Sequence, residues 1–237
     1  MRAFLAAFSL VGILFAGPLS ADPKPDGAYV LSADVDLVAL LPPPPLPGSP
    51  EDKADIAAVL AYEKTRTPET SERAVADNEM TIFRLAGVVM GPDFTPEKLP
   101  VTTAFFAKVR QDSGKPTEAI KAYYNRPRPA AAEPSVKALL PLPKNAAYPS
   151  GHTTWARLNA IVLSAMAPEK RVEIFARADE YADDRIVAGV HYPTDIAAGK
   201  IAGTLLAQKE LENPAFKTDF EAAKVELRSV LKLNATQ

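Results

Sequence analysis

The stretch from Pro149 to His152, PSGH, runs directly into TTWARLNAIVL at positions 153–163. The apolar residues of this run recur at helical spacing, which predicts a helix over 152–165. Ser150 then lies at or near the N-cap, and Gly151 lets a ligand approach the backbone closely. Exposed amides and the positive end of the helix dipole would face such a ligand. The stretch therefore predicts a helix whose N-terminus binds an anion.

Helical patterns dominate the rest of the chain as well. Apolar residues recur three and four positions apart in Ala-rich segments that often begin with Pro, Ser, Thr or Asp. We expect further helices over 52–67, 68–90, 96–111, 117–124, 168–187, 193–211 and 214–231. The segment 30–41 could be extended, but an isolated strand has no partner here. The expected fold is an all-α multi-helix bundle, with the functional residues gathered at its top: Arg128, His152, Arg185 and His191.

Three basic side chains lie in or near the motifs of this bundle: Lys121, Arg128 and Arg185. A phosphate monoester carries negative charge on its non-bridging oxygens, so an enzyme that uses no metal must surround it with fixed cations. Arginine suits planar, bidentate contact with phosphate oxygens, whereas lysine acts as a compact point charge. These three residues are therefore candidates for binding phosphate.

Only two histidines occur in the chain. His191 is followed four residues later by Asp195, a carboxylate that could fix the imidazole tautomer and stabilise the cation formed when the other ring nitrogen attacks. His152 is then the remaining imidazole that could protonate a leaving alkoxide and later accept a proton from water. The pattern indicates a phosphoryl-transfer site.

Three ordered blocks of sequence carry a resemblance to a known family. They are Lys-x6-Arg-Pro (121–129), Pro-Ser-Gly-His (149–152) and Arg-x5-His-x3-Asp (185–195). This arrangement resembles the phosphatidic acid phosphatase type 2 superfamily, which includes the vanadium haloperoxidases. In particular, it is similar to the soluble class A bacterial non-specific acid phosphatases.

The resemblance implies a role for each residue of the blocks. His191 would be the nucleophile and form a phosphohistidine, His152 would be the general acid and then the base, and Asp195 would orient His191. The implied phosphate-binding residues are Lys121, Arg128, Ser150, Gly151 and Arg185. One position departs from the family pattern, because Asp184 precedes Arg185 where the family usually has serine. This carboxylate could pair with a cation or weaken the phosphate site by repulsion.

The N-terminal segment predicts export. Residues 1–21 have the pattern of a cleaved secretory signal, with Arg2 followed by an apolar stretch and small residues before Asp22. The apolar stretch is shorter than the ~20 residues that span a bilayer, so no stable membrane insertion is expected after cleavage. Residues 22–237 suffice for one sizeable core and contain no convincing linker, which predicts a single acid phosphatase domain. The expected location is the periplasm, and a chain without cysteine brings no disulfides there.

The composition also bears on partners and cofactors. A formal net charge of −2 argues against nucleic acid as a partner. Two histidines, no cysteine and no clustered carboxylates near them leave no plausible two-metal site, so neither a metal nor another cofactor is expected. Small phosphorylated substrates are the expected partners, and the family resemblance allows a homo-oligomer built on an apolar helix face.

Three functions fit these observations. The leading one is a metal-independent acid phosphatase, with lipid phosphates less favoured because the chain has no membrane spans. A vanadate-dependent haloperoxidase would hold vanadate on His191, although such enzymes are generally larger. A non-catalytic phosphate-binding protein would need the cations and amides but neither the two imidazoles nor Asp195.

Other residues near the motifs are expected to have structural roles. Arg126 does not fit the spacing of the first block and is expected to be solvated. The charged residues of 69–79 should form a solvated helix face, although the family resemblance allows part of this cluster near the pocket. Trp155 should belong to the core. Three tyrosines could line the pocket or pack in the core with their hydroxyls at its edge: Tyr123, Tyr124 and Tyr148.

Overall fold

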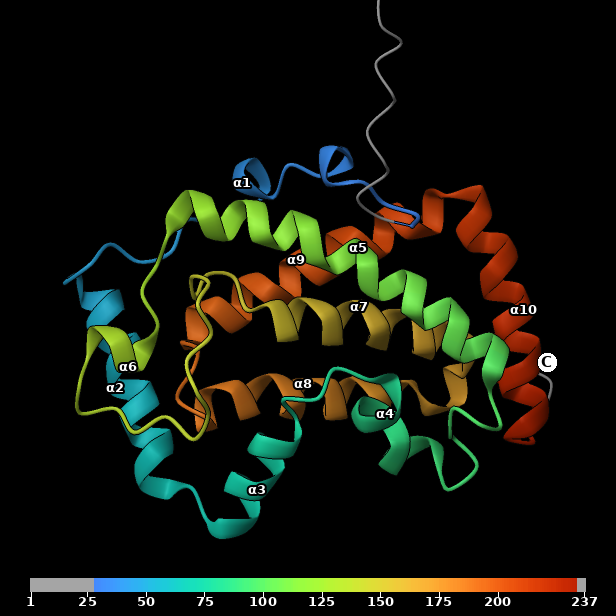
Figure 1. Cartoon of the computed structure of the whole chain (residues 1–237), viewed down its shortest axis with the longest axis horizontal. Coiled ribbons are helices and arrows are strands. Elements are labelled where there is room, and N and C mark those ends of the chain that lie inside the picture. The colour runs from blue at the N-terminus through green and yellow to red at the C-terminus, as the bar shows by residue number, and fades with distance from the viewer. Residues whose placement is uncertain (1–27, 234–237) are drawn as a thin grey trace, which may run out of the picture.

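The computed structural model describes residues 28–233, and all regular structure in this range is helical. This confirms the expected all-α fold (Figure 1). In chain order the elements are η1 (Ser32–Asp34), α1 (Leu37–Leu40), α2 (Pro50–Thr65), α3 (Pro68–Ala76), α4 (Ile82–Met90), α5 (Pro100–Tyr124), α6 (Pro129–Ala132), α7 (Gly151–Met166), η2 (Pro168–Lys170), α8 (Arg171–Val187), α9 (Pro193–Glu212) and α10 (Pro214–Val230).

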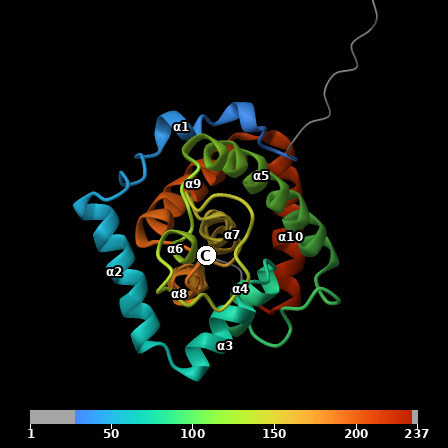
Figure 2. The ribbon, with the colours of Figure 1, turned by 60° about the vertical axis from the view of Figure 1, so that its left-hand side comes forward.

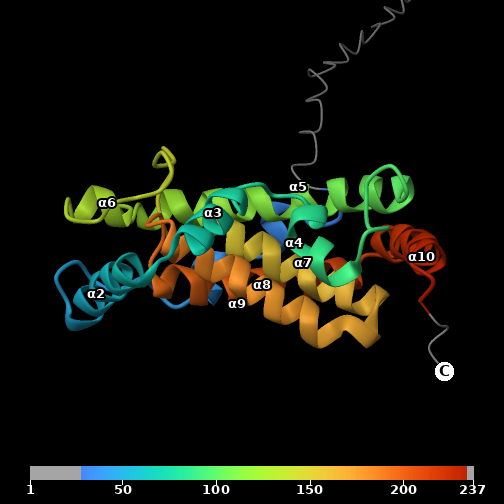
Figure 3. The same ribbon diagram turned by 90° about the horizontal axis from the view of Figure 1, so that it is seen from below.

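Helix α7 forms the centre of the bundle. Viewed toward one end, it is surrounded by α5, α9, α8 and α4 (Figure 2). It packs most extensively against α9 and α8, and the view from below shows α5 on the opposite side of α7 (Figure 3). Trp155, Leu158 and Leu163 of α7 are all buried, so Trp155 is a core residue as expected. The motif at the start of α7 that is predicted to bind an anion is therefore carried by the central helix of the fold.

Two glycines allow α9 to lie very close to α7. A Cβ atom at Gly203 would lie 2.4 Å from the carbonyl oxygen of Thr154, and one at Gly199 would lie 2.9 Å from that of Ser150. Neither separation is possible for a real side chain, because packed atoms resist such overlap. The close contact aligns the two helices side by side. It places the start of α9, which carries Asp195, beside the start of α7.

The expected helix over 68–90 is wrong, because the chain leaves the helix at Asp77 and starts α4 at Ile82. The Asp77 side chain is fully buried and accepts hydrogen bonds from Arg84 at 2.6 Å and Arg177 at 2.7 Å. The Thr81 hydroxyl caps α4 by accepting from the Arg84 amide at 3.1 Å. Asp77 therefore does not belong to a solvated face, and the turn after it brings residues 78–80 to the site.

The separate helices expected over 96–111 and 117–124 are one helix, α5, which passes through Pro116. A proline in a helix interior removes one backbone hydrogen bond and normally bends or ends the helix. Here Val109 and Ile120 are both fully buried in the main core, so packing on either side of Pro116 holds the two halves in line. The segment 30–41 forms η1 and α1 rather than an extended strand.

The predicted signal sequence, 1–21, lies outside the described residues. Between residues 28 and 233, no helix combines the length and the apolar character needed to cross a membrane.

Candidate active site

The three sequence blocks meet at one pocket of about 220 Å³. Six of the eight predicted site residues line it: Lys121, Arg128, Gly151, His152, Arg185 and His191. The other two, Ser150 and Asp195, are fully buried and make contacts with the loops and helix starts that carry the lining residues. The structure thus brings together all of the residues that the sequence placed at the site.

The His191 ring is hydrogen-bonded at both nitrogens. Its Nδ1 lies 3.1 Å from Asp195 Oδ2, and its Nε2 lies 3.1 Å from Nη1 of Arg128. A guanidinium can only donate, so Nε2 must be the acceptor and Nδ1 must carry the proton that Asp195 accepts. The arrangement fixes a neutral His191 with its Nε2 lone pair at the pocket. This is the tautomer that a nucleophile acting through Nε2 requires.

Arg126 is a buried partner of Asp195, so the expectation of a solvated side chain is wrong. It is only 6% exposed, and its Nη1 donates to Asp195 Oδ1 at 2.8 Å. Its Nη2 donates to Asp55 Oδ2 at 2.8 Å, and its guanidinium stacks 3.9 Å above the Tyr192 ring. Burial raises the pKa of Asp195, and Arg126 is the main charge opposing that rise. Arg126 therefore favours the ionised form of the carboxylate that is hydrogen-bonded to His191.

Two of the predicted phosphate-binding cations already use their donors within the protein. Lys121 Nζ donates to the carbonyl oxygens of Ala146, Ala147 and Pro149 at 2.6 to 3.0 Å. Burial, assisted by nearby Arg128, lowers the pKa of Lys121 to about 7. Arg128 donates to His191 and to carbonyl oxygens that include those of Asn145 and Val190. Both cations hold the loop before α7 in place and contribute positive charge to the pocket.

Of the three predicted phosphate-binding cations, Arg185 is the one with donors that have no partner in the described part of the chain. It is 1% exposed, and only its Nη2 has a hydrogen-bond partner among the described residues, the Oδ1 atom of Asn78 at 3.2 Å. Its Nε and Nη1 atoms are buried without any partner there. Buried N–H groups without an acceptor are costly, and those of a charged group are costlier still. An anion in the pocket would supply the missing acceptors.

His152 lies at the start of α7 and lines the pocket together with Arg185, with which it shares Asn78 as a hydrogen-bond partner. Its Nε2 is 3.1 Å from the carbonyl oxygen of Asn78, to which it donates, and its ring stacks on Tyr181 with the centroids 6.3 Å apart. Burial and then the charge of Arg185 lower the pKa of His152 to about 3. Burial and the charge of Arg128 also lower the pKa of His191. Both imidazoles are therefore neutral in the free site near neutral pH.

Ser150 is the N-cap of α7, as the sequence predicts. Its hydroxyl accepts from the Thr153 amide at 3.3 Å, and its own amide donates to the carbonyl oxygen of Asp195 at 3.1 Å. Ser150 therefore connects the starts of α7 and α9. Of the two adjacent residues Ser150 and Gly151, only Gly151 lines the pocket.

Asp184 pairs with a cation outside the pocket. Arg73 of α3 approaches it with two donors, Nε at 2.8 Å and Nη2 at 3.0 Å, in a bidentate contact. Burial raises the pKa of Asp184 to about 6, partly offset by Arg73. Of the two outcomes that the sequence left open, pairing is the one that the structure shows. The residue that departs from the family pattern joins α8 to α3.

Two further residues belong to the site and were missed by the sequence reasoning. Asn78 accepts hydrogen bonds from Arg185 at its side-chain oxygen and from His152 at its carbonyl oxygen. The side-chain oxygen of Asn145 accepts a hydrogen bond from Arg128 at 2.8 Å. Neither lies in the three blocks, although Asn78 follows the buried carboxylate of Asp77 at a helix end. The three tyrosines do not line the pocket; Tyr148 is buried and donates to the Pro42 carbonyl oxygen.

The described part of the chain contains no group of three or more acidic or histidine side chains placed to hold a metal ion. The positive charge at the pocket comes instead from Lys121, Arg128 and Arg185. The arrangement offers a neutral nucleophilic nitrogen, an oriented carboxylate, fixed cations and a second imidazole. These are the groups that phosphoryl transfer by way of a covalent histidine intermediate requires.

Comparison with known proteins shows what the chain resembles. Residues 101–211 match the family model described as the PAP2 superfamily. A non-specific acid phosphatase of Providencia stuartii is 29% identical and covers 98% of this chain and 100% of its own. One from Salmonella typhimurium is 28% identical and covers 79% of this chain and 78% of its own. An acid phosphatase of Zymomonas mobilis is 27% identical, covering 86% and 79%.

These relatives confirm the predicted resemblance to bacterial non-specific acid phosphatases and the predicted enzyme class, a phosphoric monoester hydrolase.

Solved structures agree on the fold. A transmembrane PAP2 type phosphatidylglycerolphosphate phosphatase of Bacillus subtilis matches 78% of this chain and 91% of its own at 19% identity, with a TM-score of 0.53. Aquifex aeolicus LpxE matches 67% and 95% at 24% identity, with a TM-score of 0.50.

Proposed function

We propose that this protein is an exported, metal-independent acid phosphatase that hydrolyses small phosphomonoesters through a phosphohistidine on His191. The observation that carries the proposal is that Arg185, whose Nε and Nη1 have no partner among the described residues, lines the same pocket as His191, whose Nε2 carries the lone pair. The donors would hold phosphoryl oxygens while the lone pair faces phosphorus. The positive end of α7 at Gly151 adds to the attraction.

The reaction has two balanced steps. In the first, His191 Nε2 forms a bond to phosphorus while the ester P–O bond breaks, and the leaving oxygen takes a proton from His152. In the second, His152 accepts a proton from water, the resulting hydroxide attacks phosphorus, and the P–N bond breaks to release inorganic phosphate. Asp195 stabilises the positive charge that His191 carries between the steps.

The protonation of His152 depends on the substrate. Its pKa of about 3 in the free site leaves it neutral at physiological pH. A bound phosphoryl dianion offsets Arg185, Arg128 and Lys121, the cations that disfavour protonation. We infer that the proton needed by the leaving group enters the site together with the substrate.

A quench experiment tests the nucleophile. The mature protein is mixed with a 32P-labelled phosphomonoester in excess chelator and quenched in alkaline detergent, because a P–N bond does not survive acid. Wild-type protein should retain label and His191→Gln should retain none. His152→Gln is the matched control, since it keeps the nucleophile and should still be labelled by an ester with a good leaving group. Label on His191→Gln would refute the assignment.

The same preparation distinguishes the alternatives. A haloperoxidase would oxidise bromide with added vanadate and peroxide but fail to turn over p-nitrophenyl phosphate. A simple phosphate-binding protein would bind phosphate and do neither. Export through residues 1–21 is tested by the N-terminal mass of protein recovered from the periplasm, which should begin at Asp22 after cleavage.

A further inference from the structure

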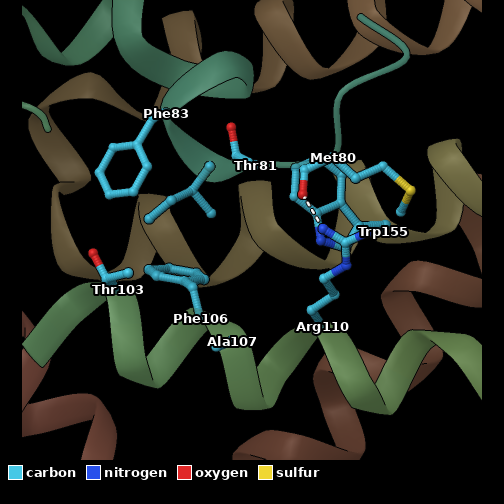
Figure 4. Close-up of a pocket in the computed structure, with 9 residues that line it drawn as sticks. Met80, Thr81, Phe83, Thr103, Phe106, Ala107, Arg110 and Trp155 are labelled. Atoms are coloured by element: carbon cyan, nitrogen blue, oxygen red, sulfur yellow. Dashed lines mark hydrogen bonds between the residues drawn. The ribbon is translucent and has the colours of Figure 1, made fainter. Parts of the chain in front are cut away.

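A second pocket of about 170 Å³ lies between α4 and α5. Its walls are largely apolar and include Ile82, Phe83, Phe106, Ala107 and Trp155. Figure 4 shows the rings of Phe83 and Phe106 at one end of the pocket and Trp155 at the other. A dry apolar cavity of roughly 150 Å³ is enough to bind benzene. The pocket therefore has room for a single aromatic ring.

The apolar pocket adjoins the phosphate-binding pocket. Met80 lines both of them. Helix α5 also lines both, with residues spaced three or four apart along one face: Thr103, Phe106, Ala107 and Arg110 in the apolar pocket, and Ser113, Gly114, Thr117 and Lys121 in the other. The two pockets are therefore consecutive parts of one groove along α5.

The hydrogen bond from Arg110 Nη1 to the Met80 carbonyl oxygen, 2.6 Å long, lies where the two parts meet (Figure 4). Arg110 is exposed, so its side chain can move without disturbing the core. On α7, His152 lines the phosphate side and Trp155 the apolar side. Three residues of α-helix rise about 4.5 Å. A group attached to the ester oxygen beside His152 thus reaches the apolar pocket within about one helical turn.

We propose that the apolar pocket receives the aromatic end of the leaving group, which makes phosphomonoesters with a single ring on a short flexible linker the preferred substrates. This inference rests on the proposed phosphatase function, because the position of His152 defines the side on which the leaving group departs. The aromatic walls favour edge-to-face contact with a ring. A phosphate alone would leave this part of the groove unused.

The test is a series of ω-phenylalkyl phosphates with linkers of increasing length, compared with ethyl phosphate. Their alcohols are similar leaving groups, so differences in kcat/KM report binding of the ring. Burying one ring should raise kcat/KM by about 10- to 100-fold over ethyl phosphate at the best linker length. A flat series would overturn the proposal. An equal gain with unbranched alkyl phosphates of the same length would overturn the preference for a ring.

A matched pair of variants localises the effect. Ala107 and Ala104 are both exposed on α5, so replacing either by leucine should not disturb the core. Only Ala107 lines the apolar pocket. Ala107→Leu should abolish the gain for the phenylalkyl esters while leaving ethyl phosphate turnover and vanadate inhibition unchanged. Ala104→Leu should leave the whole series unchanged. A full gain retained in Ala107→Leu would refute the assignment.

The failures of the two proposals remain distinguishable. If neither ethyl phosphate nor p-nitrophenyl phosphate is hydrolysed, the phosphatase function itself is wrong. If both are hydrolysed and the series is flat, only the aromatic pocket is wrong.

Discussion

Arg126 offers a sharp test of how the site is held together. Arg126→Gln leaves two carboxylates, Asp55 at 4% exposure and Asp195 at 0%, without their shared cation. Removing one partner of a buried ion pair costs about 3–5 kcal/mol, because the remaining charge stays buried and uncompensated. With two carboxylates affected, we expect a loss in the upper part of this range. This is a large share of the roughly 5–15 kcal/mol that stabilises a typical domain.

The loss should depend on pH with a defined sign. The pKa of Asp195 is already raised by burial, and removing Arg126 raises it further. Between the unfolded and folded pKa values the native state then binds more protons than the unfolded state, so stability falls as pH rises. Arg126→Gln should therefore be most destabilised at neutral pH and recover on acidification. Its kcat should fall more than its KM rises, because Arg126 acts through Asp195 and His191.

Urea unfolding at several pH values, with kcat measured on the same samples, tests this reasoning. Lys98→Gln is the control, because it removes an exposed ion pair with Asp93 that is worth at most about 1 kcal/mol. Adding Asp55→Asn to Arg126→Gln removes one of the unpaired charges and should recover part of the loss. A single-variant loss below about 1 kcal/mol, or a loss that grows on acidification, would refute the argument from buried charge.

Three other perturbations have outcomes that the structure defines. Gly203→Ala should lower the free energy of unfolding by about 1–3 kcal/mol through overlap with the Thr154 carbonyl oxygen, whereas Gly87→Ala, with open space around it, should raise it by about 0.5–1 kcal/mol in a thermal melt. Burial and the neighbouring Asp112 raise the pKa of Glu210 well above its ordinary value, so the free energy of unfolding should fall as pH rises from the ordinary to the raised pKa. Unfolding measured at two pH values should show a smaller pH dependence for Glu210→Gln than for the wild type. Binding of tungstate near pH 6 should be accompanied by uptake of a proton, measured by calorimetry in buffers of different ionisation enthalpy. His152→Ala should lose this uptake, and uptake that persists in the variant would show that another group titrates.

The site was predictable from the sequence where spacing alone specifies geometry. The three-residue gap between His191 and Asp195 spans one turn at the start of a helix, so the carboxylate lies beside the ring whatever the rest of the fold does. Ser150 before an apolar helical run likewise indicates a cap from local chemistry alone. That Arg185 shares a pocket with His152 was implied by the family resemblance and not by spacing.

The rest depended on contacts between distant segments. Local sequence predicts a solvated Arg126 because its partners, Asp55 and Asp195, lie 71 and 69 residues away in the chain. Pro116 appeared to separate two helices because the local rule for proline is strong, and buried side chains on both sides of it outweigh that rule. The break at Asp77 had a local signal in Thr81, a good N-cap, but the continuous helical spacing obscured it.

The hydrogen bond from Arg128 to His191 Nε2 affects the reactivity of the resting protein. The Nε2 lone pair, which would attack phosphorus in the proposed mechanism, accepts a hydrogen bond from Arg128 at 3.1 Å in the free site. A neutral alkylating or acylating reagent does not attract the Arg128 guanidinium, so it would meet a His191 Nε2 whose lone pair is already hydrogen-bonded. A phosphoryl dianion would compete with His191 Nε2 for this guanidinium. If His191 is the nucleophile, this hydrogen bond would favour attack on anionic phosphoryl groups over reaction with neutral electrophiles.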